Sequence, residues 1–293
     1  MHDIDSLERE RRTLLALAYR MLGTVSDAED AVQETYLRWY RLTDAERDAI
    51  ENPAAWLTRV ASRVCLDVLG SARVRRESYV GEWLPEPVPA DAAIAASVPR
   101  DPLEQVTLDD AVSTALLVVL DALTPAERVA FVLHDVFGVP FAEIAGIVGR
   151  SPDAVRKLAS TARRRIAERR ERVASREEHD AVARAFAVAT ATGDLDALVA
   201  LLDPAAVARS DGGGRVSAAL RPVVGADRVA RFLLGLPRLE PDAVLEPVET
   251  PDGLSFLASV DGRVNTVITL AVANGKVTEV YLVRNPDKLT LWR

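Results

Sequence analysis

The 293-residue sequence predicts a multidomain protein in which two all-α domains precede an α+β domain. Residues 1–80 and 103–176 carry apolar side chains at helical spacing. Residues 81–102 separate these two segments and hold too many prolines for regular structure, so we expect a semi-rigid linker. Residues 177–293 combine helical segments with apolar, β-branched runs, which indicates helices followed by an antiparallel sheet.

Length and composition exclude several classes of protein. A chain of this length corresponds to about two domains at roughly 150 residues each. Its 49% hydrophobic and 27% charged residues are typical of a globular protein, which excludes a disordered, collagen-like or disulfide-stapled chain. No apolar run approaches the roughly 18 residues of a membrane-spanning helix, and the first residues lack the apolar region of a signal peptide. We therefore expect a cytoplasmic protein without membrane contacts.

Few residues suit catalysis or metal binding. The one cysteine, Cys65, excludes an internal disulfide, and we expect it to be a small buried apolar residue. The three histidines form no cluster with it, so we expect no metal site, no cofactor and no catalytic residue. The net charge of −8 argues against bulk affinity for nucleic acid, but Arg150–Arg176 holds ten Lys/Arg and three Asp/Glu. This basic segment indicates either a confined anion-binding surface or a solvated helix face.

Local signals mark four helix starts in the first two helical segments. Ser26–Glu29 and Thr124–Glu127 have the spacing of capping boxes. Asn52 and Ser151 each precede a proline, which predicts an N-cap followed by proline at the first helical position. After Asn52, apolar residues recur every four positions, at Trp56, Val60, Val64 and Val68.

The last segment carries the signals of helices and hairpins. Its helices are expected at about His179–Thr192, Asp194–Leu202 and Gly225–Leu234. Three dipeptides separate its β-branched runs: Asp252-Gly253, Asp261-Gly262 and Asn274-Gly275. Such pairs favour type I′ turns, because both central residues of these turns need a positive φ. We therefore expect hairpins at these positions.

Residues 140–167 predict a helix-turn-helix. The first helix would pack inward through Phe141, Ile144, Ala145 and Val148, and the second through Val155, Ala159, Ala162 and Ile166. Gly149 suits the turn between them. The outward residues, which are the expected DNA contacts, are Ser151, Asp153, Arg156, Lys157, Ser160, Arg163 and Arg164. Arg156 and Lys157 stand where such motifs read base edges, whereas Arg163–Arg165 suit phosphates. The alternative is an ordinary helical hairpin with a basic rim.

Three stretches resemble the extracytoplasmic-function (ECF) sigma factors of bacterial RNA polymerase. Residues 123–166, which include the helix-turn-helix, resemble region 4, the module that reads the -35 promoter element. Residues 19–41 (YRMLGTVSDAEDAVQETYLRWYR) resemble regions 2.1–2.2, and residues 52–76 (NPAAWLTRVASRVCLDVLGSARVRR) resemble regions 2.3–2.4. The order of the modules and the linker between them make this resemblance specific.

The resemblance implies two further binding surfaces. A polar strip in the first stretch would bind the coiled-coil clamp helices of the polymerase β′ subunit, and its residues are Asp30, Gln33, Glu34 and Leu37. Without the family, a solvated acidic face would be the simpler interpretation. The residues implied for the -10 element are Trp56, Arg59, Arg63, Arg73, Arg75 and Arg76. Arg63 stands where many relatives have asparagine.

The C-terminal 115 residues or so resemble a SnoaL-like cone domain, in which a curved sheet wraps a pocket. ECF factors with this extension carry similar motifs, and the family implies that the extension regulates the sigma factor in cis. The implied regulatory contacts are Trp83, Leu84, Asp211, Gly212, Gly213, Gly214, Arg215, Asn285, Pro286, Asp287, Lys288 and Leu289. We expect Trp83 and Leu84 to dock as an apolar anchor, and the cone domain to dock on region 2 or on the linker.

The sequence thus predicts a sigma factor that binds core polymerase and promoter DNA. The alternative is a SnoaL-like enzyme or sensor of an unidentified small ligand, whose sigma-like half tethers it to DNA. Arg209, Asp211, Asn265 and Arg284 would be the pocket candidates for such a ligand. A lone arginine or asparagine in a sheet is more often structural than catalytic, so we expect no enzyme.

Overall fold

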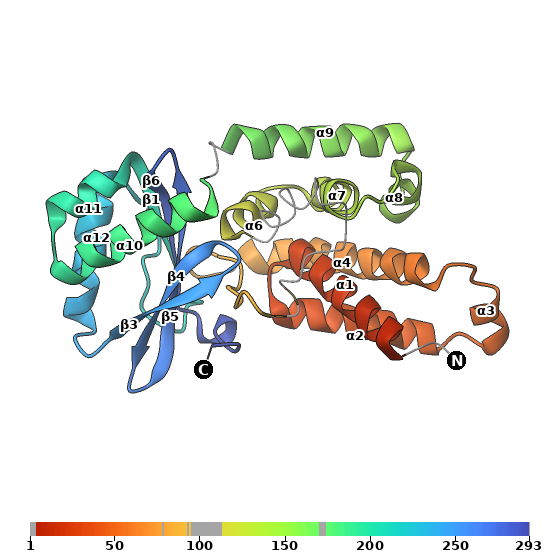
Figure 1. The fold of residues 1–293 in the computed structure, drawn as a ribbon. Coiled ribbons are helices and arrows are strands. Elements are labelled where there is room, and N and C mark those ends of the chain that lie inside the picture. Colours follow the sequence, from red (N-terminus) through yellow and green to blue (C-terminus); the bar gives the residue numbers. More distant parts are fainter. Residues whose placement is uncertain (1–3, 78, 93, 95–112, 170–173, 293) are drawn as a thin grey trace. The chain divides into compact units, whose positions relative to one another are not determined.

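The computed structural model describes residues 4–77, 79–92, 94, 113–169 and 174–292 (Figure 1). The chain separates into two compact units. The first comprises Met1–Glu77, Asp91–Val112 and Leu116–Arg169, and the second comprises Ser78–Ala90, Ser113–Ala115 and Arg170–Arg293. The second unit therefore contains the C-terminal part of the chain together with two short segments from the helical part.

The first unit is helical throughout its described part. Its helices are α1 (Ile4–Leu22), α2 (Val25–Tyr40), α3 (Asp44–Asp48), α4 (Pro53–Glu77), α6 (Thr114–Asp121), α7 (Pro125–Phe131), the π-helical turn η3 (Val132–Val136), α8 (Phe141–Val148) and α9 (Pro152–Arg169). α1, α2 and α4 pack on one another as a three-helix bundle, and α9 packs on α7 and α8 (Figure 1). The first residues of α6 belong to the second unit.

The predicted helix starts are confirmed at three of four positions. Thr124 forms a complete capping box with Glu127, and the side chains of Asn52 and Ser151 accept hydrogen bonds from the backbone N–H groups of Ala55 and Ala154. The prediction of a capping box at Ser26 is wrong. α2 begins at Val25 and is capped by Thr24, whose hydroxyl accepts from the N–H of Asp27, because Thr24 is the residue with extended backbone.

The buried face of α4 differs from the line of apolar residues that recur every four positions in the sequence. Of the four residues expected at a spacing of four, Val64 is buried, whereas Trp56, Val60 and Val68 are half-buried. The buried residues of the helix are Leu57, Ala61, Ser62, Val64, Cys65 and Leu69. The buried face thus alternates leucines with small residues, and Trp56 lies at its edge.

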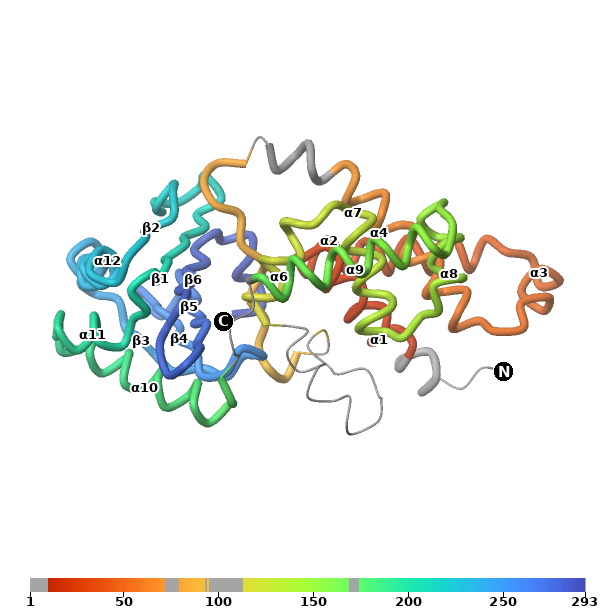
Figure 2. The backbone as a smooth tube through the Cα atoms, turned by 90° about the horizontal axis from the view of Figure 1, so that it is seen from above, coloured from red at the N-terminus to blue at the C-terminus, as the bar shows by residue number. Residues whose placement is uncertain are grey.

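The second unit is a curved sheet with helices on one side (Figure 2). Its strands are β1 (Leu202–Asp211), β2 (Val223–Val224), β3 (Val244–Thr250), β4 (Gly253–Val260), β5 (Arg263–Ala273) and β6 (Lys276–Val283), in the order β2-β1-β6-β5-β4-β3. Its helices are α10 (Arg176–Thr192), α11 (Leu195–Leu201), α12 (Ala226–Leu239) and the 3₁₀ turn η4 (Pro286–Lys288). The sheet is mixed rather than purely antiparallel, because β1 pairs with β6 in parallel.

Two of the three hairpin turns have the predicted conformation. Asp261-Gly262 and Asn274-Gly275 have positive φ at both residues, from 51° to 71°. The prediction of a type I′ turn at Asp252-Gly253 is wrong. Thr250 pairs with Gly253, so Pro251 and Asp252 form the turn instead. Gly253 has a φ of 121°, and a Cβ there would lie 2.3 Å from a ring nitrogen of His179. Close packing, not turn type, therefore requires this glycine.

The core of the second unit lies between the sheet and its helices. Phe186 of α10 and Leu233 of α12 pack with Phe256 and Leu270 of the sheet, and all four side chains are buried. Burying a side chain of this size contributes roughly 1.5–3 kcal/mol. One face of the sheet is thereby closed, which leaves the opposite face for the linker described below.

Candidate functional site

The helix-turn-helix forms from α8 and α9. Gly149 ends α8 in the left-handed conformation, with a φ of 68°, and the N–H of Arg150 bonds the carbonyl of Ala145. The four predicted inward residues of α9, Val155, Ala159, Ala162 and Ile166, are buried. In α8, Ile144 and Ala145 are buried, whereas Phe141 and Val148 are half-buried.

The expected DNA contacts share the exposed face of α9. Ser151, Asp153, Arg156, Lys157, Ser160, Arg163 and Arg164 are all exposed. Ion pairs already engage part of this face: the Nε of Arg163 donates to Asp135 at 2.6 Å, and Arg165 bonds Glu127 of α7 at 2.9 Å. Arg164 has the most exposed side chain of the three, at 71%. Arg165 thus helps to hold α9 on α7, which its sequence position did not indicate.

The polar strip of α2 lies on the surface of the helical bundle. Asp30, Gln33 and Leu37 are exposed, whereas Glu34 is half-buried and accepts a hydrogen bond at 2.8 Å from Arg38, four residues later. Leu37 is 44% exposed, a large fraction for an apolar side chain. The strip therefore combines acidic groups with an uncovered apolar residue.

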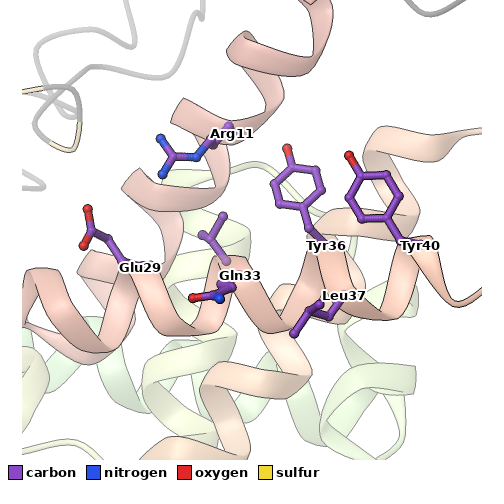
Figure 3. Close-up of a pocket in the computed structure, with 7 residues that line it drawn as sticks. Arg11, Glu29, Gln33, Tyr36, Leu37 and Tyr40 are labelled. Atoms are coloured by element: carbon purple, nitrogen blue, oxygen red, sulfur yellow. The ribbon is translucent and has the colours of Figure 1, made fainter.

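A cavity of about 430 Å³ adjoins this strip (Figure 3). It is lined by Arg11, Glu29, Val32, Gln33, Tyr36, Leu37 and Tyr40. The rings of Tyr36 and Tyr40 lie side by side, 6.4 Å apart, and Tyr40 is 65% exposed. The Tyr36 hydroxyl is buried without a hydrogen-bond partner among the described residues, and burial raises its pKa. Neither tyrosine was among the predicted site residues, although their spacing of four places them on one helix face.

The residues expected at the -10 element divide into three groups. Trp56 packs edge-on against Trp39, with ring centroids 5.2 Å apart, and Arg59 is exposed. Arg63 donates to the carbonyl oxygen of Gly146 in α8 at 2.8 Å, so it contacts the helix-turn-helix in this structure. The side chains of Arg73, Arg75 and Arg76, at the end of α4, lie outside the described residues.

Two buried arginines join the helical bundle to the helix-turn-helix part of the first unit. Arg128 of α7 donates to the carbonyl oxygens of Met21 at 2.7 Å and Leu120 at 2.8 Å, and burial lowers its pKa to about 9. Arg20 of α1 lies 5.9 Å from the ring of Phe137 and is 1% exposed. Its Nε and Nη2 have no partner among the described residues, and burial lowers its pKa to about 10.

The linker docks on the second unit through Leu84, which is 1% exposed. The N–H of Leu84 donates to Asp211 at 2.9 Å, and its carbonyl accepts from the Nζ of Lys288 at 2.6 Å. Lys288 also binds Asp211 at 2.7 Å, in an ion pair with both side chains buried. The Lys288 ammonium lies 4.2 Å from the centre of the Trp83 ring. We call this cluster, comprising Trp83, Leu84, Asp211 and Lys288, the linker latch.

Further polar contacts surround the linker latch. The hydroxyl of Tyr79 donates to Asp211 at 2.6 Å and accepts from the side-chain amide of Asn285 at 2.9 Å. Burial and the adjacent carboxylate raise the pKa of Tyr79. The indole N–H of Trp292 donates to the carbonyl of Pro87 at 2.9 Å. The expected regulatory segments thus meet around one buried carboxylate.

The glycine motif fits tightly beside this cluster. A Cβ on Gly212 would lie 2.4 Å from the carbonyl oxygen of Val216, and a Cβ on Gly213 would lie 2.4 Å from the Asn285 side chain. Gly213 and Gly214 also have positive φ values of 62° and 69°. The motif ends in Arg215, which pairs with Asp287 at 3.1 Å on the surface. Pro286 and Leu289 lie in and after η4, and Leu289 is buried.

A second contact with the sheet lies at the start of α6. The backbone N–H and the hydroxyl of Thr114 each donate to the carboxylate of Asp252, both at 2.7 Å. Asp252 is in the turn between β3 and β4, so the sheet supplies a cap to a helix that starts more than a hundred residues earlier. Burial raises the pKa of Asp252, and the two bonds from Thr114 counteract this shift.

The pocket candidates of the sheet do not form one site. Arg209 bonds Glu82 of the linker at 2.8 Å and Glu279 at 3.2 Å, and Asp211 belongs to the linker latch. Asn265 and Arg284 instead meet at Glu240, where Arg284 also donates to a carbonyl of the adjoining loop. Each candidate is therefore engaged by the protein itself, two of them by the linker.

Catalytic and metal-binding groups are scarce in the described part of the chain. Cys65 is buried, and burial raises the pKa of its thiol to about 12, so it carries no reactive thiolate at neutral pH. His179 bonds Asp180 and the carbonyl of Leu270 in the core, at 3.1 Å each. The described residues include no group of three or more metal-ligating side chains, and none of their helices is both long and apolar enough to cross a membrane.

Comparisons with known proteins cover nearly the whole chain. Residues 7–76 match the Sigma-70 region 2 family, and residues 113–166 match Sigma-70, region 4. The ECF RNA polymerase sigma factor SigJ of Mycobacterium tuberculosis is 41% identical, over 98% of this chain and 93% of SigJ. SigI of the same organism is 38% identical, over 95% of this chain and 92% of SigI.

A solved structure shows a similar architecture. The crystal structure of Mycobacterium tuberculosis SigJ matches with a TM-score of 0.78 and 37% identity, over 98% of both chains. The fold is that of two all-α sigma domains and a SnoaL-like α+β domain, as the sequence predicts. This similarity extends over the α+β unit as well as the helical unit. It therefore does not favour the alternative of an enzyme that a sigma-like half tethers to DNA. The chain belongs to the ECF sigma factors of RNA polymerase.

Proposed function

We propose that this sigma factor directs promoter-specific initiation of transcription by binding core polymerase through α2 and promoter DNA through α4 and α9. The observation that carries this proposal is the helix-turn-helix surface, where the seven expected DNA contacts between Ser151 and Arg164 are exposed while the four predicted inward residues of α9 are buried. Run-off transcription with purified core polymerase tests it. A promoter-dependent transcript is expected, and no transcript from any promoter in a randomised library would contradict it.

The α2 strip and its cavity are the proposed surface for the β′ clamp helices. Leu37 and Tyr40 supply exposed apolar area, and Asp30 supplies charge that can steer the encounter. The Tyr36 ring lines the cavity between them.

The DNA face predicts different effects for two arginines. Arg156→Ala is expected to relax base preference in the -35 element, because a bidentate contact to a base contributes about 1–3 kcal/mol of discrimination. Arg164→Ala is expected to weaken binding to all sequences and to lower the salt slope by about one, as loss of a phosphate contact does. Both variants would be measured as holoenzyme on promoter fragments. Arg228→Ala, an exposed arginine of α12, is the control.

Equal losses of affinity on every sequence for the Arg156 and Arg164 variants would contradict this assignment. The helix would then bind phosphates alone. A salt slope unchanged by Arg164→Ala would separately remove that residue from the phosphate contacts.

We also propose that the C-terminal domain regulates the sigma factor in cis through the linker latch. Region 2 and region 4 must separate to reach two promoter elements, and a linker held by Asp211 and Lys288 restricts that separation. Leu84 is the apolar anchor, and its burial contributes about 1.5–3 kcal/mol. Releasing it should shift the chain toward the extended arrangement.

Leu84→Asp is therefore expected to raise run-off transcription several-fold at matched occupancy of core polymerase. A change of 1.4 kcal/mol in the equilibrium between arrangements corresponds to a factor of ten. Trp83→Ala should act in the same direction with a smaller effect, because Trp83 is only half-buried. Leu291→Asp, at an exposed leucine near the same segment, is the control. Wild-type output from both linker variants would exclude regulation through this contact.

The remaining expectations follow from the engaged pocket residues. We propose a non-enzymatic protein that needs no cofactor, because Arg209 and Asp211 bind the linker and Asn265 and Arg284 bind Glu240. We propose a cytoplasmic location because the relatives are sigma factors of RNA polymerase. An unidentified small ligand in the cone domain would have to displace Glu82 from Arg209. Such a ligand would release the linker and act as an inducer.

A further inference from the structure

Three planar side chains stack at the start of the recognition helix. The ring of His134 in η3 lies on the ring of Phe141, with centroids 3.8 Å apart and planes inclined by 27°. On the Phe141 ring lies the guanidinium of Arg156, with its central carbon 5.4 Å from the ring centre. A hydrogen-bonding contact of 3.1 Å between the His134 Nδ1 and the Val139 carbonyl oxygen fixes the base of the stack. The stack thus connects the first unit's interior to an exposed arginine.

An acidic side chain holds the same arginine from a second direction. Asp153, one turn before Arg156, accepts a hydrogen bond from its Nη1 at 2.6 Å. Both side chains are largely exposed, Arg156 at 60% and Asp153 at 83%, so this ion pair contributes little to stability. A carboxylate on a DNA-binding face also repels phosphates. Asp153 lies in the first turn of α9, where the helix dipole favours a carboxylate, and its bond to Arg156 gives it a second role at the DNA face.

We propose that Asp153 and Phe141 are positioning residues that hold the Arg156 guanidinium in one orientation for a guanine of the -35 element. Arginine reads guanine through two parallel N–H donors, which bind the O6 and N7 atoms. With Nη1 held by Asp153 and one face held by Phe141, Nε and Nη2 remain as a donor pair. Fixing a long side chain before binding lowers the entropy that binding costs. The inference rests on the proposed role of α9 in reading the promoter.

The two positioning residues should give different signatures in holoenzyme binding to promoter fragments. Phe141→Leu keeps apolar bulk but removes the ring, so discrimination at the guanine should fall about 3- to 10-fold. The salt slope should stay unchanged, because no phosphate contact is lost. Phe141→Tyr keeps the ring and should keep the wild-type ratio of affinities for promoter fragments with and without the guanine. Asp153→Ala should lower the same ratio while raising affinity for all sequences, since it removes a negative charge from the DNA face.

A double-mutant cycle separates positioning from folding. In an Arg156→Ala background, Phe141→Leu should change discrimination no further, because the group that it orients is absent. Asp227→Ala, which breaks another exposed ion pair on α12, is the matched control and should change neither ratio nor affinity. Circular dichroism confirms that each variant is folded.

The outcomes distinguish the inference from the proposed function. In one outcome, Arg156→Ala loses discrimination at the guanine while Phe141→Leu and Asp153→Ala keep the wild-type value. That result would overturn the positioning role and leave the base contact of Arg156 in place. Full discrimination in Arg156→Ala would overturn the base contact itself. A Phe141→Leu variant that weakens all promoters equally, without rescue by tyrosine, would show that the ring only supports the fold.

Discussion

Replacing Asp211 with asparagine is expected to destabilise the second unit by about 3–5 kcal/mol, the cost of removing one partner of a buried ion pair. The Lys288 ammonium would remain buried opposite a neutral amide, and the amide would present a donor where Asp211 accepts from Tyr79, Leu84 and Gly213. Denaturation with urea, followed by circular dichroism, measures the change. The same variant should release the linker and raise run-off transcription.

The surface pair beside the linker latch provides the control. Arg215 and Asp287 belong to the same two motifs but are 62% and 57% exposed, so Asp287→Asn should cost less than about 1 kcal/mol. A cycle that combines Asp211→Asn with Lys288→Met should recover part of the loss, because the second change removes the uncompensated charge. Equal effects of Asp211→Asn and Asp287→Asn would show that burial does not strengthen this pair.

Reversing two charges on α2 is expected to abolish binding to core polymerase. Asp30→Arg with Glu34→Arg would place positive charge where the clamp helices are expected to meet acidic groups, and such like-charge contacts cost several kcal/mol. Each 1.4 kcal/mol corresponds to a tenfold weaker complex, so the loss should exceed 100-fold. A pull-down with core polymerase, supported by circular dichroism of the variant, measures it.

The matched control makes the same change in net charge elsewhere. Asp196→Arg with Asp227→Arg replaces two exposed carboxylates on α11 and α12, and should leave core binding unchanged. If both double variants weaken the complex equally, the effect comes from net charge and not from the α2 strip. Wild-type binding by the folded α2 variant would refute the assignment of this surface.

Local sequence patterns predicted those parts of the fold that short-range physics decides. In α9, the Ser151 cap, the glycine before it and four apolar residues at helical spacing fix the inward face without help from other segments. In α4, apolar residues at a spacing of four did not mark the buried face, because only Val64 of the four is buried. Trp56 and Val60 are only half-buried, whereas Leu57 and Ala61, each one position further along the chain, are buried, because packing against α1 and α2 sets the inward face.

Long-range pairs in the candidate sites lay beyond the sequence patterns. The resemblance to a family indicated which motifs meet, but nothing local indicated that Lys288 would sit between Trp83 and Asp211. The cavity on α2 depends likewise on Arg11 of another helix. Pairs of this kind depend on the tertiary fold, which brings Lys288 next to Asp211, 77 positions earlier in the chain.

The bond between Thr114 and Asp252 has a consequence for dissecting this protein. Region 4 begins with α6, yet the carboxylate that caps this helix comes from the turn between β3 and β4, so the compact units of the fold do not follow the boundaries of the family match. A chain shortened after residue 177 would lose that cap and expose Leu84 together with its unpaired backbone groups. Transcription by such a chain would therefore reflect lost structure together with lost regulation. Point variants in the intact chain therefore separate regulation from folding, and truncation mixes the two.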